Sequence, residues 1–197
     1  MPSESRVIIF DMDGTLTRSI LDFEVIRNEI GLPEGPILES IQMLPPAGRA
    51  RAEEILRRHE ALASQANVLQ EGAAQVVAKI RERGLPVALM TRNSRQSVAD
   101  FLARYEMVFD HVRTREDGAM KPLPDPVHEI CKVFNRKSSD AWVIGDFLFD
   151  IQCGSAAGAK TVLFVEPDTK IPEWSVEADH VITRLAELLT LLGLNQA

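Results

Sequence analysis

A short apolar run that ends abruptly in acidic residues constrains the fold more than any other feature of this chain. Val7 to Phe10 is an unbroken series of β-branched and aromatic side chains, which is typical of a strand buried on both faces. Asp11, Asp13 and Gly14 follow at once. Carboxylates at the carboxyl end of a buried parallel strand lie where open α/β sheets bind ligands. Because burying two acids is costly, we expect a cation or fixed hydrogen-bond donors beside them.

This acidic stretch has two other interpretations when it is taken alone. A polar strand end followed by a turn, with no further role, stays open at this point. A calcium-binding loop also begins with the pattern Asp-x-Asp, but Leu16 stands where such a loop needs glycine, and Asp22 stands where it needs glutamate. The rest of the chain therefore decides between a plain turn and a functional site.

From Gly72 onwards, apolar segments with strand and helix character alternate. Strands are expected at residues 86–90, 108–112, 141–146, 161–165 and 180–183. Helices are expected at residues 73–83, 96–105, 126–134, 147–157 and 185–192. This alternation predicts a doubly wound, mostly parallel, Rossmann-like α/β sheet with helices on both faces.

The segment between the first strand and Gly72 has apolar residues at helical spacing only. Three helices are expected, the first around residues 23–30, the second around residues 37–44 and the third at residues 49–66. We therefore expect a small all-helical cap domain at residues 17–70, inserted after the first strand, and an α/β core domain made of residues 1–16 and 71–197. Such an insert lies at the carboxyl edge of the sheet, as a lid.

Composition restricts the partners and the compartment. Hydrophobic residues make up 45% of the chain and the net charge is −7, which argues against nucleic acid or an anionic membrane as the main partner. The two cysteines lie far apart in sequence without metal-ligand spacing, as in reduced cytoplasmic proteins. The N-terminal residues 1–5 leave no room for a signal peptide before the first strand. We expect a cytoplasmic protein, and a monomer.

Three further polar clusters follow predicted strands or lie in a loop on the same edge. Thr91, Arg92 and Asn93 offer a hydroxyl, an amide and backbone N–H groups to an oxyanion, although a helix cap at Ser94 or nearby is an alternative. Lys121 precedes a stiffening proline, and a lone loop lysine is normally only solvated. Asp146 and Asp150 flank the end of the strand at 141–146, where Asp150 alternatively caps the next helix.

Taken together, these clusters converge on one crevice. Several carboxylates around one point need a hard cation, and ligation by oxygen alone favours Mg²⁺. A lysine and a threonine on the same edge suit a phosphate, whose charge the metal and the lysine share. The sequence thus predicts a magnesium site that binds a phosphate ester.

The four clusters, in order along the chain, resemble the haloacid dehalogenase (HAD) superfamily, in its helical-cap branch with phosphoglycolate-phosphatase-like enzymes. The matching positions, in order, are Asp11 to Thr15, Thr91, Lys121 with Pro122, and Gly145-Asp146 with Asp150. The resemblance implies that Asp11 is a nucleophile that forms an aspartyl-phosphate and that Asp13 is the general acid and base.

The resemblance also implies the remaining roles. Thr91 and the amides of Arg92 and Asn93 would hold the phosphoryl group, and Lys121 would neutralise it. Mg²⁺ would bind Asp11, the backbone carbonyl of Asp13, and Asp146. Asp150 would either bind the ion directly or contact one of its ligands. Arg18 either contacts an anionic substrate or lies on the rim of the site.

Among reactions of the family, a phosphatase that acts on a small phosphorylated metabolite fits best. A dehalogenase lacks the acid at the position of Asp13, and a phosphonatase needs a cap lysine, whereas the first lysine here is Lys79. A sugar phosphomutase, with Arg49, Arg51, Arg57 or Arg58 gripping a second phosphate, stays an alternative. So does a catalytically silent binding or regulatory protein, although Asp11, Asp13, Thr91, Lys121 and Asp146 are all present.

Overall fold

The computed structural model describes residues 5–18 and 20–195, and it divides the chain into two compact units. One unit comprises Met1–Ser19 and Val68–Ala197, and the other comprises Ile20–Asn67. Each limit of the expected cap domain, at residues 17 and 70, lies three residues outside the second unit. Residues 1–4, most of the stretch considered for a signal peptide, lie outside the described residues. No helix within the described ranges is both long and apolar enough to cross a membrane.

The first unit is built on a six-stranded sheet in which every pairing is parallel. The strand order is β3-β2-β1-β4-β5-β6. The strands are β1 (Val7–Phe10), β2 (Val87–Met90), β3 (His111–Arg113), β4 (Ala141–Gly145), β5 (Lys160–Phe164) and β6 (His180–Ile182). The chain places β2 and β3 on one side of β1, then returns to place β4 on the other. The carboxyl ends of β1 and β4 therefore form the switch point where doubly wound sheets bind ligands.

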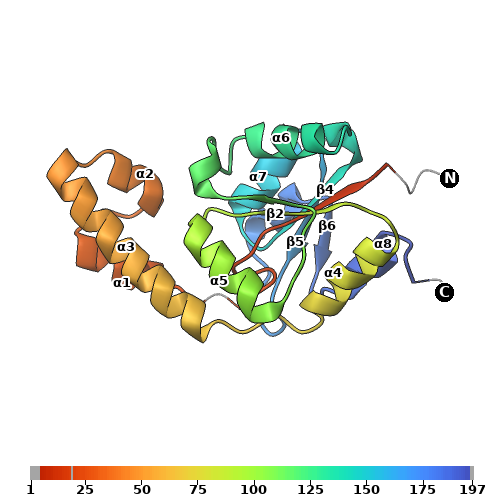
Figure 1. Ribbon diagram of the computed structural model, residues 1–197, viewed down its shortest axis with the longest axis horizontal. Coiled ribbons are helices and arrows are strands. Elements are labelled where there is room, and N and C mark those ends of the chain that lie inside the picture. Colours follow the sequence, from red (N-terminus) through yellow and green to blue (C-terminus); the bar gives the residue numbers. More distant parts are fainter. Residues whose placement is uncertain (1–4, 19, 196–197) are drawn as a thin grey trace. The chain divides into compact units, whose positions relative to one another are not determined.

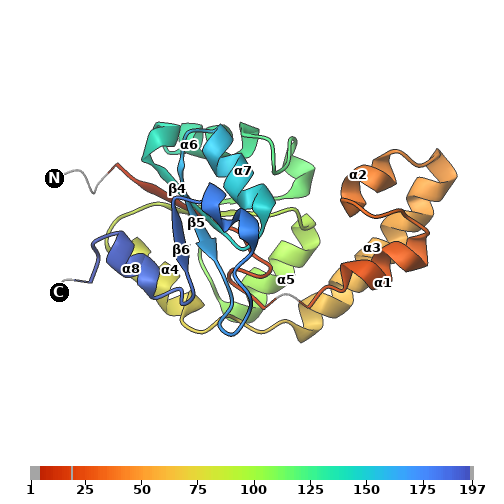
Figure 2. The same ribbon diagram turned by 180° about the vertical axis from the view of Figure 1, so that it is seen from behind.

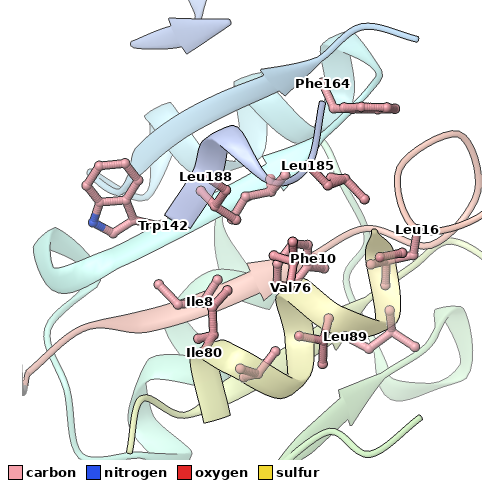
Figure 3. Packing of buried hydrophobic residues seen from close by; sticks show 14 of the residues in the cluster. Ile8, Phe10, Leu16, Val76, Ile80, Leu89, Trp142, Phe164, Leu185 and Leu188 are labelled. Carbon is pink, nitrogen blue, oxygen red and sulfur yellow. The ribbon is translucent and has the colours of Figure 1, made fainter. Parts of the chain in front are cut away.

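Alternate residues of the central strands pack on opposite faces of the sheet, as a strand's period of two requires. Ile8 and Phe10 pack with one buried cluster, whereas Val7 and Ile9 pack with another. Figure 3 shows side chains of the first cluster, among them Phe10, Val76, Leu89 and Leu188. Burying each such side chain stabilises the fold by about 1.5–3 kcal/mol. This two-sided burial explains why β1 reads as an unbroken apolar run.

Helices cover both faces, which confirms the predicted fold class (Figure 1). Helices α4 (Ala73–Glu82), α5 (Arg95–Tyr105) and α8 (Glu187–Leu191) supply the first cluster, and α6 (Asp125–Val133) and α7 (Leu148–Ala156) supply the second. Short 3-10 turns lie at Arg115–Asp117, Ser138–Asp140 and Glu173–Glu177. The view from behind shows the same two layers around the sheet (Figure 2).

Strand β3 differs from the expected strand at residues 108–112, because it begins only at His111. Just before it, the Asp110 carboxylate accepts a hydrogen bond from the backbone N–H of Val87 at 2.9 Å. A side-chain carboxylate thus accepts the hydrogen bond that a backbone carbonyl would accept in a continuous parallel strand pair. Asp110 is held in turn by Arg81 at 3.0 Å.

The second unit contains three helices, α1 (Phe23–Ile30), α2 (Ile37–Gln42) and α3 (Pro46–Ala66). Their shared core contains Ile26, Ile37, Ile41, Ala52 and Leu56. Helix α3 begins at Pro46 rather than at residue 49, because a proline is well suited to the first helical position, where no N–H partner is lost. Helix α1 is capped by the Asp22 side chain and ends at Gly31 in the left-handed conformation.

The two connections to this second unit are joined inside the first unit. The segment that leaves β1 for the second unit is hydrogen-bonded to the segment that returns from it. Arg18 N donates to Val68 O at 2.9 Å, and Gln70 N donates to Leu16 O at 2.8 Å. Thr17 and Leu69 form an antiparallel bridge between these bonds. The residues directly after β1 are therefore fixed in place by the sheet-bearing unit itself.

Candidate active site

Gly14 brings the end of β1 into close contact with the end of β4. The residue has a φ of +84°, and a Cβ atom there would lie 2.1 Å from the Asp146 carboxylate oxygen Oδ2. A residue with a side chain would therefore both strain the backbone and displace Asp146. Asp146 also accepts a hydrogen bond from the Thr15 hydroxyl at 3.0 Å. The close approach of Asp146 to the chain after β1 thus requires a glycine at position 14.

Asp150 lies in the first turn of α7 and turns back towards the same point. Its Oδ2 accepts the N–H of Phe147 at 3.2 Å, so it does cap the helix as one interpretation held. Its side chain is nevertheless 2% exposed and packs on Gly145, where a Cβ atom would lie 2.2 Å away. One carboxylate oxygen from each of Asp11, Asp146 and Asp150 falls within 4.8 Å of the others. Asp150 therefore both caps the helix and belongs to the acidic cluster.

Lys121 places its ammonium group between two of these acids. Its side chain is 5% exposed, and Nζ lies 2.5 Å from Asp11 Oδ1 and 2.5 Å from Asp150 Oδ1. The loop lysine is therefore buried rather than solvated. Three carboxylates, of which that of Asp146 is only partly buried, and one ammonium still leave an excess of negative charge, which a divalent cation would compensate. All the ligand atoms are oxygens, so the donor set fits a hard ion such as Mg²⁺.

The pKa values of the acids reflect this excess of negative charge. Burial raises the pKa of Asp11 well above its usual range, and the Asp150 and Asp146 carboxylates add to the effect, against the opposing charge of Lys121. Burial and the Asp150 charge raise the pKa of Asp146 to about 7. Although burial alone would lower the pKa of Lys121, Asp11 and Asp150 raise it. The lysine therefore stays charged, while Asp11 and Asp146 are deprotonated only at a free-energy cost.

Asp13 lies in a different environment from Asp11. Its Oδ1 accepts the Thr17 hydroxyl at 3.1 Å, and its Oδ2 accepts a short hydrogen bond from the Asn93 side-chain amide. Burial raises the pKa of Asp13, while the Asn93 and Thr17 hydrogen bonds oppose that rise. A carboxyl group of this kind, held in one orientation and with a raised pKa, is suited to carrying a proton.

In the turn after β2, Ser94 and not Thr91 or Asn93 caps the following helix. Ser94 caps α5, because its hydroxyl accepts the N–H of Ser97 at 3.2 Å. Thr91 is 6% exposed, and its Oγ1 accepts the N–H of Asn93 at 3.1 Å. The Arg92 side chain turns to the neighbouring loop, where Nη1 donates to Lys121 O at 3.1 Å and the guanidinium lies 5.0 Å from the centre of the Phe149 ring.

The structure thus connects most of the residues that the sequence selected. Lys121 forms ion pairs with Asp11 and with Asp150 in α7. Asn93, in the turn after β2, donates a hydrogen bond to Asp13. Arg18 is not among them, because its Nε pairs with Glu166 at 3.4 Å and its side chain is 60% exposed.

The sequence reasoning did not predict that two threonines orient these acids, although Thr15 belongs to the first matching motif. Thr15 donates to Asp146 and Thr17 donates to Asp13. Their signal was present, since both hydroxyls directly follow the acidic pair at alternate positions. It also missed Arg113, a buried guanidinium for which no local pattern exists.

The chain is similar to known hydrolases over most of its length. A protein-family model described as haloacid dehalogenase-like hydrolase matches residues 5–158. A haloacid dehalogenase-like hydrolase domain-containing protein of Arabidopsis thaliana is 30% identical over 207 residues, which cover 96% of this chain and 84% of that one. A phosphoglycolate phosphatase of Haemophilus influenzae is 26% identical, over 98% of this chain and 100% of its own.

A solved structure gives the same result for the fold. The crystal structure of a hydrolase from Pseudomonas syringae superposes with a TM-score of 0.82, at 18% sequence identity, and covers 98% of this chain and 100% of that one.

Proposed function

The chain belongs to the haloacid dehalogenase-like hydrolase family, and on that premise we propose that it is a Mg²⁺-dependent phosphatase that hydrolyses a small phosphomonoester through an aspartyl-phosphate at Asp11. One observation carries the proposal: the Lys121 ammonium lies 2.5 Å from the Asp11 carboxylate, at the switch point of the sheet. A bare carboxylate is repelled by a phosphate dianion, so a nucleophilic aspartate needs positive charge at this place. The phosphatase relative of H. influenzae supports the same reaction class.

In the first step of the proposed reaction, an Asp11 carboxylate oxygen attacks phosphorus. A bond forms between that oxygen and phosphorus, and the bond from phosphorus to the ester oxygen breaks. Asp13 gives its proton to the departing oxygen, which leaves as an alcohol. The hydrogen bonds from Thr17 and Asn93 hold the Asp13 carboxyl in one orientation for this transfer.

In the second step, Asp13 takes a proton from a water molecule whose oxygen attacks the phosphorus of the aspartyl-phosphate. The bond to Asp11 breaks, inorganic phosphate forms, and Asp11 is regenerated. Thr91 and the backbone amides of Arg92 and Asn93 hold the phosphoryl oxygens through both steps, which requires the Asn93 N–H to exchange its bond to Thr91 Oγ1 for one to the phosphoryl group. Lys121 neutralises the charge that Asp11 and the phosphoryl group share.

Mg²⁺ would be held by Asp11, Asp146 and Asp150, with the backbone carbonyl of Asp13 as a further oxygen ligand. The close approach of the three carboxylates and the raised pKa values of Asp11 and Asp146 fit a cation here. When bound, the ion supplies positive charge to the phosphoryl oxygens and to the cluster. Arg18 is the candidate for contact with an anionic leaving group, which would compete with Glu166 for its guanidinium.

The test is release of phosphate from a panel of small phosphomonoesters, with Mg²⁺ and with a chelator. The panel contains sugar phosphates, phosphoglycolate, nucleotides and an aryl phosphate. We expect Mg²⁺-dependent release that is lost in the variant Asp11→Asn, which keeps the size and fold of the site. Release that persists in pure Asp11→Asn protein, or that is indifferent to the chelator, would refute the proposal.

A further inference from the structure

A buried guanidinium group lies behind the loop that carries Lys121. It belongs to Arg113, the last residue of β3, whose side chain is only 3% exposed. Its Nη1 donates a hydrogen bond to the backbone carbonyl of Ala119 at 2.6 Å, and its Nε donates to Glu129 Oε2 in α6 at 2.7 Å. Ala119 lies two residues before Lys121, so the strand holds the backbone that leads to the lysine.

A second arginine holds the same loop at the lysine itself. Arg92 Nη1 donates to the backbone carbonyl of Lys121 at 3.1 Å. The carbonyl groups of Ala119 and Lys121 are therefore each held by a guanidinium group, one from β3 and one from the turn after β2. Because charge-assisted hydrogen bonds are stronger than neutral ones, this short segment is restrained at both of its ends.

Arg113 also joins the loop to the turn proposed to hold the phosphoryl group. In the sheet, Met90 pairs with Arg113, and the Arg113 carbonyl accepts the N–H of Thr91 at 3.0 Å. One residue thus contacts the Thr91 turn through its backbone and the Lys121 loop through its side chain. Any displacement of Arg113 would change the distance between these two parts of the site.

Stability alone explains this arrangement poorly. Within the described ranges, Arg113 Nη2 is buried and has no hydrogen-bond partner, and the Glu129 side chain is 53% exposed. A buried charge that is only partly paired costs desolvation energy, and apolar residues often fill such a position equally well. Because Glu129 is exposed enough to be hydrated, replacing Arg113 by an apolar residue leaves no stranded buried charge.

We propose that Arg113 is a positioning residue: by holding the carbonyl of Ala119, it fixes the Lys121 ammonium between Asp11 and Asp150. Its effect on turnover rests on the proposed function, in which Lys121 neutralises the nucleophile and the phosphoryl group. Its effect on the position of Lys121 does not depend on the reaction and is measurable separately.

The first measurement follows the position of the lysine without any substrate. The folded protein is treated briefly with acetic anhydride, and mass spectrometry gives the acetylation rate of Lys121 relative to that of exposed Lys137. In Arg113→Met we expect Lys121 to be acetylated at least about tenfold faster, as for the loss of one charge-assisted hydrogen bond. An unchanged rate in this variant would overturn the proposal.

Two matched variants separate positioning from general loss of an ion pair. Glu129→Gln weakens the pair with Arg113 but leaves the bond to Ala119 O, and Arg81→Met removes a different arginine–aspartate pair beside the start of β2. Both are expected to leave the acetylation rate of Lys121 unchanged. Equal acceleration in either one would overturn the proposal, because the effect would then come from lost stability. If Arg113→Met does not fold, Arg113→Lys keeps the charge but not both contacts and is expected to change the rate in the same direction.

The second measurement is a double-mutant cycle on kcat/KM with Lys121→Met. Arg113→Met is expected to lower kcat/KM by about 10- to 100-fold in the wild-type background and by less than about twofold when Lys121 is already replaced. Independent, multiplicative losses would contradict action through Lys121. If no phosphomonoester is hydrolysed, or if Lys121→Met is fully active, the proposed function fails, and the acetylation rates still decide whether Arg113 positions the lysine.

Discussion

Lys121 donates a hydrogen bond to Asp11 at 2.5 Å, although 110 positions separate the two residues in the sequence. Both side chains are almost fully buried. Each would be costly to bury alone, and together they bring a carboxylate and its paired ammonium group to the end of the central strand, where we propose that Asp11 acts as the nucleophile. The proposed chemistry follows from this pair, because a carboxylate that is already beside an ammonium is able to approach a phosphate dianion.

Replacing Asp13 by asparagine should affect poor leaving groups most, because only they need a proton as they depart. For an alkyl phosphate, we expect Asp13→Asn to lower kcat/KM by about 10²–10⁴-fold. With p-nitrophenyl phosphate, the initial burst of nitrophenolate should be reduced far less, since nitrophenolate leaves without protonation. Rapid-mixing kinetics on both substrates measures the difference, and equal losses would remove Asp13 from the role of general acid.

Adding a methyl group at Gly14 should damage the acidic cluster through Asp146. In Gly14→Ala, the new Cβ would lie 2.1 Å from Asp146 Oδ2, so the carboxylate must move. We expect a loss of activity and a higher Mg²⁺ requirement, in addition to about 1 kcal/mol of backbone strain.

The matched control for this variant is Gly31→Ala in the helical unit. Gly31 has the same φ of +84°, but a Cβ atom there would meet nothing within 4 Å. It should lose similar stability, measured by urea denaturation, while the Mg²⁺ requirement of the enzyme stays unchanged. A raised Mg²⁺ requirement in both variants would show that strain, rather than contact with Asp146, causes the effect.

Removing the metal should abolish turnover and lower the thermal stability. The three carboxylates of Asp11, Asp146 and Asp150 outnumber the single Lys121 ammonium, so a bound cation relieves their repulsion. We expect Mg²⁺ to raise the midpoint of thermal unfolding, and Asp146→Asn to reduce that gain. Ca²⁺ should not restore activity, because it favours longer bonds and more ligands than Mg²⁺ does. Full activity in Ca²⁺ would contradict a site built for the smaller ion.

Asp110 supplies a prediction about pH and stability that is independent of the active site. Although burial raises the pKa of Asp110, hydrogen bonds from Arg81 and from the Val87 N–H outweigh it and lower that pKa. An aspartate whose folded pKa is lowered stabilises the fold above its unfolded pKa, near 3.9, and loses this contribution as pH falls through the folded value.

The corresponding variant is Asp110→Asn. At pH 7 we expect it to reduce the free energy of unfolding by about 1 kcal/mol, a typical value for such hydrogen bonds. At a pH below the lowered folded pKa, the gap between the two proteins should be smaller, because the wild-type carboxyl is then protonated as well. Urea denaturation at both pH values measures the difference in the free energy of unfolding between the two proteins. A difference that is constant with pH would contradict the lowered pKa of Asp110.

The sequence predicted the sheet and its acidic edge because their signals are local. Val7 to Phe10 is buried on both faces and therefore lacks polar residues altogether, and Asp11 and Asp13 follow it directly. The helices were readable for the same reason, since their apolar spacing is set by one face. Strand β3 was placed early, because the N–H of Val87 donates to the Asp110 side chain rather than to a backbone carbonyl, which the apolar pattern does not reveal.

The pairing of side chains across the site was not readable from local patterns. That Asp150 serves both as a helix cap and as a partner of Lys121 depends on Gly145, which lets α7 lie close to the strand end. Arg113 lay just past the strand predicted at residues 108–112 and was given no role, because its partners come from α6 and from the loop before Lys121. Contacts of this kind depend on the packing of distant segments, which periodicity does not encode.

The central claim is that Asp11 is phosphorylated during turnover, and chemical trapping tests it most directly. The enzyme is mixed with substrate and Mg²⁺, quenched in acid within milliseconds and reduced with borohydride, which converts an aspartyl-phosphate into homoserine. Peptide mass spectrometry should then find homoserine at position 11 in the wild-type protein, and not when substrate is omitted or in Asp11→Asn. Rapid release of phosphate with Asp11 unmodified at every quench time would contradict the account.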